Sequence, residues 1–187
     1  CCAHQRRSEA TMKATEHLKT MVDRALKAGL TARYLLMDSW FTMPATVTAL
    51  AVSVPVIGMV KKIRTVHYRF QGQSLDLMAI YRRLKKRRGR AKILASTLVS
   101  LSSGTPCKLV FVRDRKNGDW LAILSTDTDL PDEEIVRIYG KRWDIEVFFK
   151  MIKQHLRLAK EIQCRDFDAL VGHTSIVFMR YMFLAYH

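Results

Sequence analysis

Two short apolar runs with a helical segment between them constrain this chain more than any other feature. The first run covers residues 32–38 and ends in Asp38, and the second covers residues 55–60. Pro44 starts the segment between them, since proline is favoured in the first turn of a helix. Strands that are joined through one helix by short links are parallel neighbours in a sheet. The sequence therefore predicts an α/β fold with Asp38 at the carboxyl end of a strand.

Residues 61–127 combine strand-like runs with a high density of positive charge. Residues 61–92 contain twelve Lys or Arg and one acidic residue, Asp76. The dipeptide Asn117–Gly118 is typical of a tight hairpin turn. We therefore expect a mostly β insertion within the α/β domain. Its expected elements are strands over 68–70, 93–101, 108–113 and 120–125, a short helix or loop over 75–84, and an exposed basic loop over 85–90.

Three further helices are expected outside this segment. One runs from about residue 8 to 28, where Gly29 ends the apolar periodicity. A long helix starts near Pro131 and reaches about residue 156, because acidic residues follow Pro131 and acids are stabilised near a helix N-terminus. An apolar helix follows over about 166–186. The expected core positions of the long helix are Ile135, Ile138, Trp143, Ile145, Phe149 and Ile152.

The net charge indicates a polyanionic partner. The chain has 32 Lys plus Arg against 17 Asp plus Glu, a formal charge of +15. Nucleic acid is the first candidate for such a chain, and a ribosome-associated protein or a merely basic surface are the alternatives. The four cysteines show no zinc-binding spacing, and no apolar run reaches membrane-spanning length. We expect a reduced, cytoplasmic, nucleoid-associated protein with no membrane partner.

Four polar residues recur along the expected long helix. Tyr139, Arg142, Glu146 and Lys153 are separated by gaps of 3, 4 and 7 residues, which places them within one face of a continuous helix. One interpretation is a solvated helix face on which Arg142 and Glu146 form an ion pair. The other is a functional site that combines a carboxylate with phosphate-binding groups.

The pattern Tyr139-x2-Arg142-x3-Glu146-x6-Lys153 resembles the signature of a large group of bacterial insertion-sequence DDE transposases. The segment from Asp38 to Phe41 is similar to the one that carries the second catalytic aspartate in that family. The resemblance implies an RNase H-like fold in which three carboxylates bind two Mg²⁺ or Mn²⁺ ions. It implies that Asp38 and Glu146 are catalytic metal ligands, and that the other three signature residues bind or position phosphate.

The first catalytic aspartate of this family lies on a strand upstream of the first helix. The acids before Asp38 are Glu9, Glu16 and Asp23, and all three fall on an expected helix. We therefore expect an RNase H-like domain that is incomplete at its N-terminus. Two of three carboxylates hold a metal pair poorly, so we expect this chain alone to be inactive.

Several basic and aromatic residues are candidates for DNA contact. The loop side chains Lys85, Lys86, Arg87 and Arg88 are either solvated or bound to the DNA backbone. Trp120 is either a strand core residue or, as the resemblance to the transposase family implies, a side chain that stacks on a base flipped out of the transposon end. Trp40 and Trp143 are expected to be packing groups beside the site.

The expected organisation has three parts. Residues 1–60 form the first part of the RNase H-like core, residues 61–127 the insertion, and residues 128–187 the helical part with the catalytic glutamate. The expected function is metal-dependent DNA strand cleavage and strand transfer during transposition, on double-stranded DNA and with a possible homodimer on paired ends. The alternatives are a non-catalytic DNA-binding remnant of a transposase and another RNase H-like nuclease. We expect the carboxylates of Asp38 and Glu146 to converge within roughly 4–8 Å, the scale of a shared metal pair.

Overall fold

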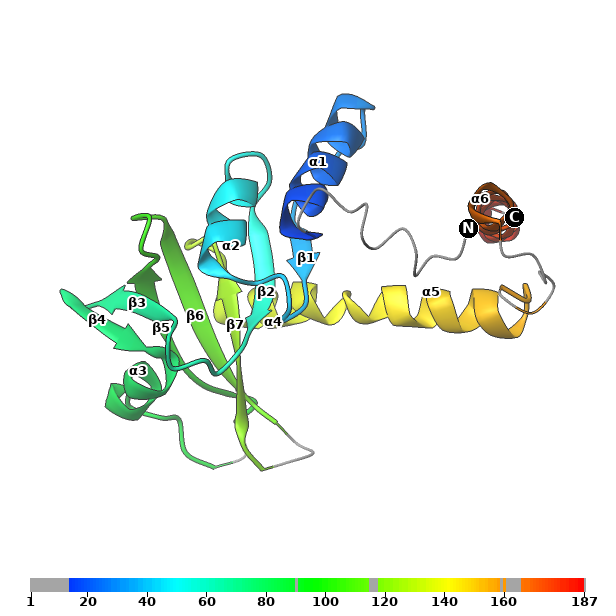
Figure 1. The fold of residues 1–187 in the computed structure, drawn as a ribbon. Coiled ribbons are helices and arrows are strands. Elements are labelled where there is room, and N and C mark those ends of the chain that lie inside the picture. Colours follow the sequence, from blue (N-terminus) through cyan, green and yellow to red (C-terminus); the bar gives the residue numbers. More distant parts are fainter. Residues whose placement is uncertain (1–13, 90, 115–117, 159, 161–165, 187) are drawn as a thin grey trace. The chain divides into compact units, whose positions relative to one another are not determined.

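The structure is a computed structural model that describes residues 14–89, 91–114, 118–158, 160 and 166–186. Figure 1 shows the order of the elements along the chain. The helices are α1 (Ala14–Lys27), α2 (Pro44–Ala51), α3 (Leu77–Arg83), α4 (Asp132–Gly140), α5 (Trp143–Gln154) and α6 (Phe167–Tyr186). The strands are β1 (Leu35–Met37), β2 (Val56–Val60), β3 (His67–Phe70), β4 (Gln73–Asp76), β5 (Ile93–Ser100), β6 (Pro106–Arg113) and β7 (Trp120–Ser125).

In the described part of the chain, seven strands form one mixed sheet in the order β1-β2-β7-β6-β5-β3-β4. β1 and β2 are parallel, with Met37 opposite Gly58, and α2 connects them. The remaining pairs are antiparallel. The predicted parallel strand–helix–strand unit and the α/β class are therefore confirmed. The strands of the expected insertion belong to this same sheet.

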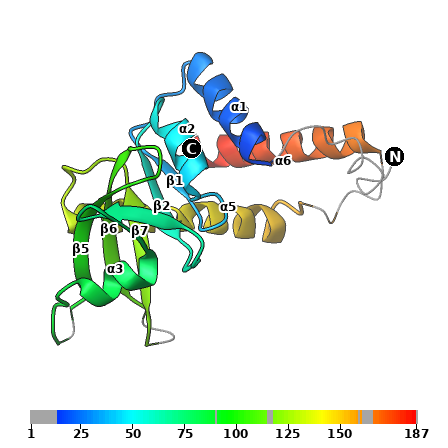
Figure 2. The same ribbon diagram turned by 60° about the vertical axis from the view of Figure 1, so that its left-hand side comes forward.

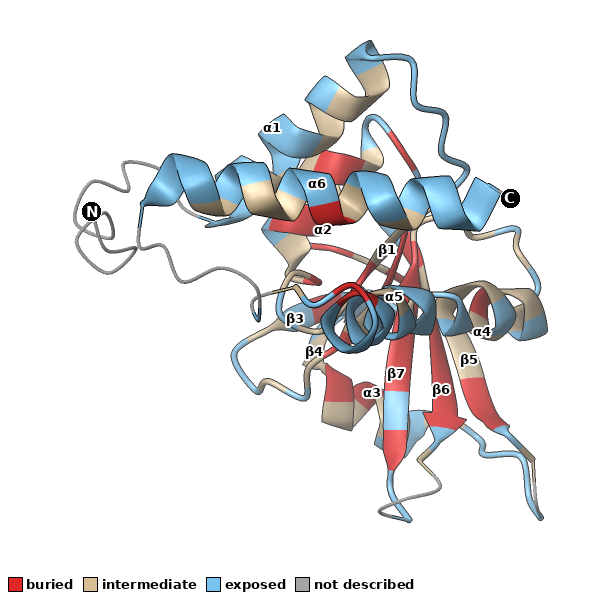
Figure 3. Cartoon of the chain, turned by 90° about the vertical axis from the view of Figure 1, so that its right-hand side faces the viewer, coloured by how far each residue is buried: buried red, intermediate tan, exposed pale blue. Residues whose placement is uncertain are grey.

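Two hydrophobic clusters cover the two faces of the sheet. The first includes Val47 and Leu50 of α2 and Leu77 and Ile80 of α3, which pack on strand residues such as Phe111. The second joins Ile135 of α4 to residues of β2, β5, β6 and β7. Figure 2 shows α2 and α3 on the same side of the sheet, and Figure 3 shows how strongly β6 and β7 are buried.

The chain divides into two compact units, one over Ala14–Lys141 and one that contains α5 and α6. In the second unit, Ile152, Leu156 and Val177 form a small core between its two helices. A pair of helices buries only the stripe where they meet, so many other apolar side chains of α5 and α6 are exposed. Among the described residues, no helix is long and apolar enough to cross a membrane.

The prediction of one long helix is wrong, because the structure has two helices, α4 and α5, which are separated at Lys141 and Arg142. At this point two backbone hydrogen bonds span three residues instead of the four of an α-helix. The Lys141 N–H donates to the Ile138 carbonyl, and the Ile145 N–H donates to the Arg142 carbonyl. Gly140 precedes the break, and glycine weakens a helix by about 1 kcal/mol relative to alanine. Of the expected core positions, Trp143, Ile145 and Phe149 are exposed. The core assignment was wrong for these three, since periodicity alone does not say which stripe meets a partner.

Other differences are local. β4 was not expected as a strand, and α3 begins at Leu77 after Asp76, whose carboxylate accepts a hydrogen bond from the Ala79 N–H at 2.7 Å. The start of the expected first helix, from residue 8 to 13, lies outside the described residues, as does Asn117 of the expected hairpin turn. Gly118 has a φ of 67°, a left-handed conformation that favours glycine.

Candidate functional site

Asp38 directly follows β1 and organises the turn after it. One carboxylate oxygen, Oδ1, accepts hydrogen bonds from the backbone N–H groups of Trp40 at 2.9 Å and Phe41 at 3.3 Å. Hydrogen bonds from two N–H groups to one oxygen fix the direction of the carboxylate, as in an Asx turn. The sequence prediction that Asp38 lies at the carboxyl end of a parallel strand agrees with this placement.

Thr42 holds the other side of the same turn. Its hydroxyl donates a hydrogen bond to the Asp38 carbonyl at 2.6 Å, and its backbone N–H donates to the same carbonyl at 3.2 Å. The Thr42 side chain is buried against Gly58 of β2. The turn that carries Asp38 is therefore fastened to the sheet through Thr42.

The four signature residues are divided between two helices. Tyr139 lies on α4, Arg142 immediately precedes α5, and Glu146 and Lys153 lie on α5. An Arg142 guanidinium nitrogen lies 2.7 Å from Glu146 Oε1, with the Glu146 side chain 43% exposed. Lys153 Nζ lies 5.9 Å from the centre of the Phe149 ring. The Arg142–Glu146 ion pair, which the sequence suggested for a solvated helix face, is thus present. The Glu146 side chain is also partly accessible to solvent.

Asp38 and Glu146 belong to different compact units. Their predicted convergence therefore remains a prediction. Among the described residues, no group of three His, Cys, Asp or Glu side chains is arranged to hold a metal ion. The two candidate carboxylates supply oxygen donors, which are the ligand type that Mg²⁺ and Mn²⁺ prefer.

The basic loop is exposed over residues 85–89, but its side chains differ in their surroundings. Arg87 lies 3.6 Å from Glu133 and 4.0 Å from Asp132, both in the first turn of α4. Lys86 Nζ donates to the Arg82 carbonyl at 3.1 Å and lies 4.9 Å from the centre of the Tyr81 ring. Lys85 and Arg88 are exposed as well. Positive charge is therefore concentrated here, and part of it is compensated by acids of the same unit.

Trp120 is buried, with 7% of its surface exposed. Its ring stacks on Tyr81 at 4.4 Å between centroids and meets Phe111 edge-on at 5.2 Å. Lys62 Nζ lies 4.1 Å from the centre of the Trp120 ring and also pairs with Asp119. Its hydrogen bond lowers the pKa of the Asp119 carboxyl below its usual value. Of the two roles that the sequence left open for Trp120, this burial favours packing in the core.

Trp40 departs from the expectation that it is a packing group. Its side chain is 74% exposed, and Lys61 Nζ lies 3.6 Å from the centre of its ring. The sequence feature that could have indicated the contact between Trp40 and Lys61 is the cluster of basic residues directly after β2. Trp143, the other tryptophan expected to pack, is also exposed.

Comparisons with known proteins find similarity to transposases. A family profile described as "Transposase DDE domain" matches residues 4–183 of this chain. A curated protein from Sinorhizobium fredii (strain NBRC 101917 / NGR234), named "Putative transposase y4zB", is 41% identical over 44 residues. This match covers 24% of the chain and spans 12% of the length of that protein. No solved structure matches significantly.

Proposed function

Because this chain belongs to the Transposase DDE domain family, we propose that it supplies Asp38 and Glu146 as two metal-binding carboxylates of an enzyme that cuts and rejoins DNA. The reaction class is phosphodiester cleavage followed by strand transfer during transposition of an insertion sequence. In this proposal the sheet and its flanking helices are the described part of an RNase H-like core, and residues 61–127 are an insertion in it. The DNA is double-stranded, and a second copy of the chain acts on the paired end.

The observation that carries the proposal is the placement of Asp38. A carboxylate at the carboxyl end of a parallel strand occupies the edge at which α/β sheets build their sites. Two backbone N–H groups hold its Oδ1, so its orientation is fixed before any ligand arrives. The resemblance of the Tyr139-to-Lys153 spacing to the transposase signature adds Glu146 as the second carboxylate.

Asp38 and Glu146 have the type of side chain that binds a divalent metal ion. Asp38 and Glu146 offer carboxylate oxygens, and Mg²⁺ or Mn²⁺ bound there would supply Lewis-acid stabilisation of charge on oxygen. Arg142 holds Glu146 through the 2.7 Å ion pair and thereby limits the rotamers of this exposed side chain. Arg142 and Lys153 are also the proposed phosphate-binding groups, since a guanidinium binds phosphate through two parallel hydrogen bonds and an ammonium acts as a point charge.

An excision assay tests the proposal. Because this chain alone is expected to be inactive, the assay uses a gene that also encodes the expected upstream strand with the first catalytic aspartate. This gene and its flanking DNA are placed on a plasmid in cells, and joining of the flanking DNA after loss of the gene is measured. We expect Glu146→Ala and Asp38→Ala to abolish excision, since one lost carboxylate disrupts the metal site. Asp144→Ala is the matched control, because Asp144 is an exposed acid on the same helix and its loss changes the net charge equally.

Gel-shift measurements on the same variants separate the alternatives. Glu146→Ala should bind DNA with nearly the wild-type affinity, because the glutamate is proposed to face metal rather than phosphate. Arg142→Ala should weaken binding as well as excision. Normal excision by Glu146→Ala would show that the polar residues of α5 are only a solvated helix face. DNA binding without excision by the wild-type protein would support a non-catalytic DNA-binding remnant.

A further inference from the structure

Trp40 exposes a large aromatic side chain to solvent beside Asp38 and Lys61. Large aromatic side chains gain free energy on burial, yet Trp40 is 74% exposed. Its backbone is nevertheless held in the turn, since the Trp40 N–H donates a hydrogen bond to Asp38 Oδ1 at 2.9 Å. The buried Thr42 anchors the same turn to the sheet. An aromatic ring is therefore presented to solvent on a rigid turn, two residues from a candidate catalytic carboxylate.

Lys61 adds a positive charge to this ring. β1 and β2 run parallel, so the turn after β1 and the residues after β2 lie at the same edge of the sheet. Lys61 directly follows β2, and its Nζ lies 3.6 Å from the centre of the Trp40 ring, a cation–π contact. Lys61 covers one face of the indole, and the 74% exposure leaves most of the remaining surface accessible. Lys62 and Arg64 follow in the same connection.

We propose that Trp40 and Lys61 form a stacking platform for an unpaired nucleobase of the DNA strand next to Asp38, with Lys61 bound to the adjacent phosphate. An aromatic face bordered by lysine and arginine is the combination with which proteins bind single-stranded nucleic acid. Trp120, which the sequence offered for base stacking, is covered by Tyr81 and Phe111. The platform rests on the proposed function, because it assumes that DNA reaches the edge of the sheet at Asp38.

The platform would position the strand rather than take part in the chemistry. A base held on the indole limits the movement of its own phosphate relative to the carboxylate, and such positioning lowers the entropic cost of a reaction. Trp40 and Lys61 are therefore positioning residues.

The test is a binding experiment in EDTA, which excludes cleavage and therefore does not depend on the catalytic proposal. The probes are two DNA duplexes with the same single-stranded extension, one of thymidines and one in which the extension carries abasic sugars. Wild-type protein should prefer the thymidine extension. Trp40→Ala should bind the thymidine probe about 5- to 150-fold more weakly, the range given by alanine replacement of stacking aromatics. The same variant should bind the abasic probe with nearly unchanged affinity.

Two further variants separate stacking from a structural role. Trp40→Phe keeps an aromatic face and should restore much of the preference for the thymidine probe. Lys61→Ala should lower the slope of log affinity against log salt by about 1 on both probes, as expected for one lost phosphate contact. Leu98→Ala, which removes an exposed apolar side chain from β5, should change neither quantity.

The outcomes distinguish the platform from the proposed function. Equal losses on both probes in Trp40→Ala would overturn the platform and indicate a structural role for the indole, while leaving DNA binding intact. Absence of preference for the thymidine probe in the wild-type protein would overturn it too. No binding of either probe by the wild-type protein would overturn both proposals.

Discussion

The Thr42 hydroxyl lies 2.6 Å from the Asp38 carbonyl, and it can lie there because residue 58 on the neighbouring strand is glycine. A Cβ at position 58 would lie 2.3 Å from Thr42 Oγ1 and 2.8 Å from Thr42 Cγ2. Thr42 is β-branched and buried, so it has few other rotamers available. Gly58 thereby controls the turn that presents both Asp38 and Trp40.

Replacing Gly58 with alanine should destabilise the protein and disturb this turn. We expect the free energy of unfolding to fall by about 1–3 kcal/mol, the usual cost of overpacking a core. Urea denaturation measures the loss. The double variant Gly58→Ala with Thr42→Ala should be less destabilised than the sum of the two single variants, because removal of the threonine side chain makes room for the added methyl group.

Gly140→Ala is the matched control for this experiment. A Cβ at Gly140 meets nothing within 4 Å, and this glycine ends α4. The same chemical change should therefore stabilise the protein by up to about 1 kcal/mol through helix propensity. If Gly58→Ala unfolded at the wild-type urea concentration, the close contact with Thr42 would have no energetic consequence.

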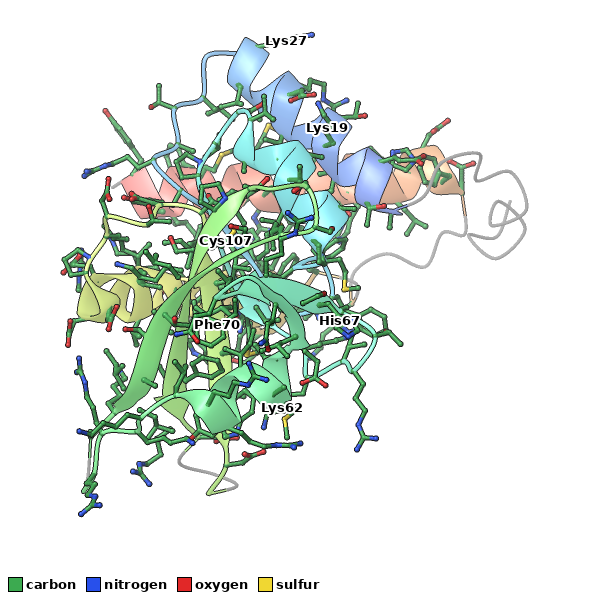
Figure 4. The ribbon with its side chains drawn as sticks, turned by 90° about the vertical axis from the view of Figure 1, so that its left-hand side faces the viewer. Lys19, Lys27, Lys62, His67, Phe70 and Cys107 are labelled. Atoms are coloured by element: carbon green, nitrogen blue, oxygen red, sulfur yellow. The ribbon has the colours of Figure 1, made fainter. Side chains whose placement is uncertain are left out.

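The buried thiol of Cys107 predicts a loss of stability at high pH. Cys107 lies on β6 within the sheet (Figure 4), and burial raises the pKa of its thiol from 9.0 to about 12. Burial also raises the pKa of the Tyr68 phenol. Because the folded state holds these protons more tightly, their contribution to stability is complete below pH 9 and is lost as the pH rises toward 12.

We expect the free energy of unfolding to fall above pH 9 by up to about 1.4 kcal/mol per pH unit for each such group. Urea denaturation at pH 8, 10 and 11 measures this slope. Cys107→Ala and Tyr68→Phe should each make it shallower, although each loses some stability at pH 8. Identical slopes in all three proteins would mean that neither group titrates with unfolding.

The basic loop predicts a strong salt dependence of DNA binding. Replacing Lys85, Lys86, Arg87 and Arg88 with alanine should lower the slope of log affinity against log salt by up to about 4, roughly one per lost phosphate contact. Because Arg87 lies near Glu133 and Asp132, Arg87→Ala alone should contribute less than Lys85→Ala or Arg88→Ala.

A charge-matched control separates the loop from the net charge of the protein. Arg24→Ala with Lys27→Ala removes two positive charges from the end of α1, where Figure 4 labels Lys27. The double variant Lys85→Ala with Arg88→Ala removes the same number from the loop. Equal decreases in slope for the two double variants would place the DNA path elsewhere than on the loop.

Local signals in the sequence account for the central strand–helix–strand unit. Pro44 and the two apolar runs predicted it, and α2 begins at Pro44 as expected and ends at Ala51. Apolar runs and a proline at a helix start act within a few residues, so one sequence is enough to recognise them. The position of Asp38 at the end of β1 followed directly from this unit.

Burial and helix continuity were harder to predict, because they depend on what lies across from a residue. Trp40 and Trp120 have the same side chain, but Trp40 is exposed and Trp120 packs against Tyr81 and Phe111 in the core. The break between α4 and α5 follows from Gly140 together with tertiary packing of Ile135 and Ile152 in separate cores. The spacing of Tyr139 and Arg142 alone was compatible with one continuous helix.

The distance between Asp38 and Glu146 can be measured by chemical cross-linking. Cys1, Cys2 and Cys164 are replaced with serine, and Cys107 is retained because its buried, protonated thiol reacts slowly. Cysteines are then introduced as Asp38→Cys and Glu146→Cys. If the carboxylates converge within roughly 4–8 Å, as a shared metal pair requires, a short bismaleimide should join the two cysteines within one chain, which changes gel mobility.

The control pairs Asp38→Cys with Asp144→Cys on another side of α5, where we expect much slower cross-linking. Faster cross-linking of the control pair would place Glu146 away from Asp38 and contradict its assignment as the second carboxylate.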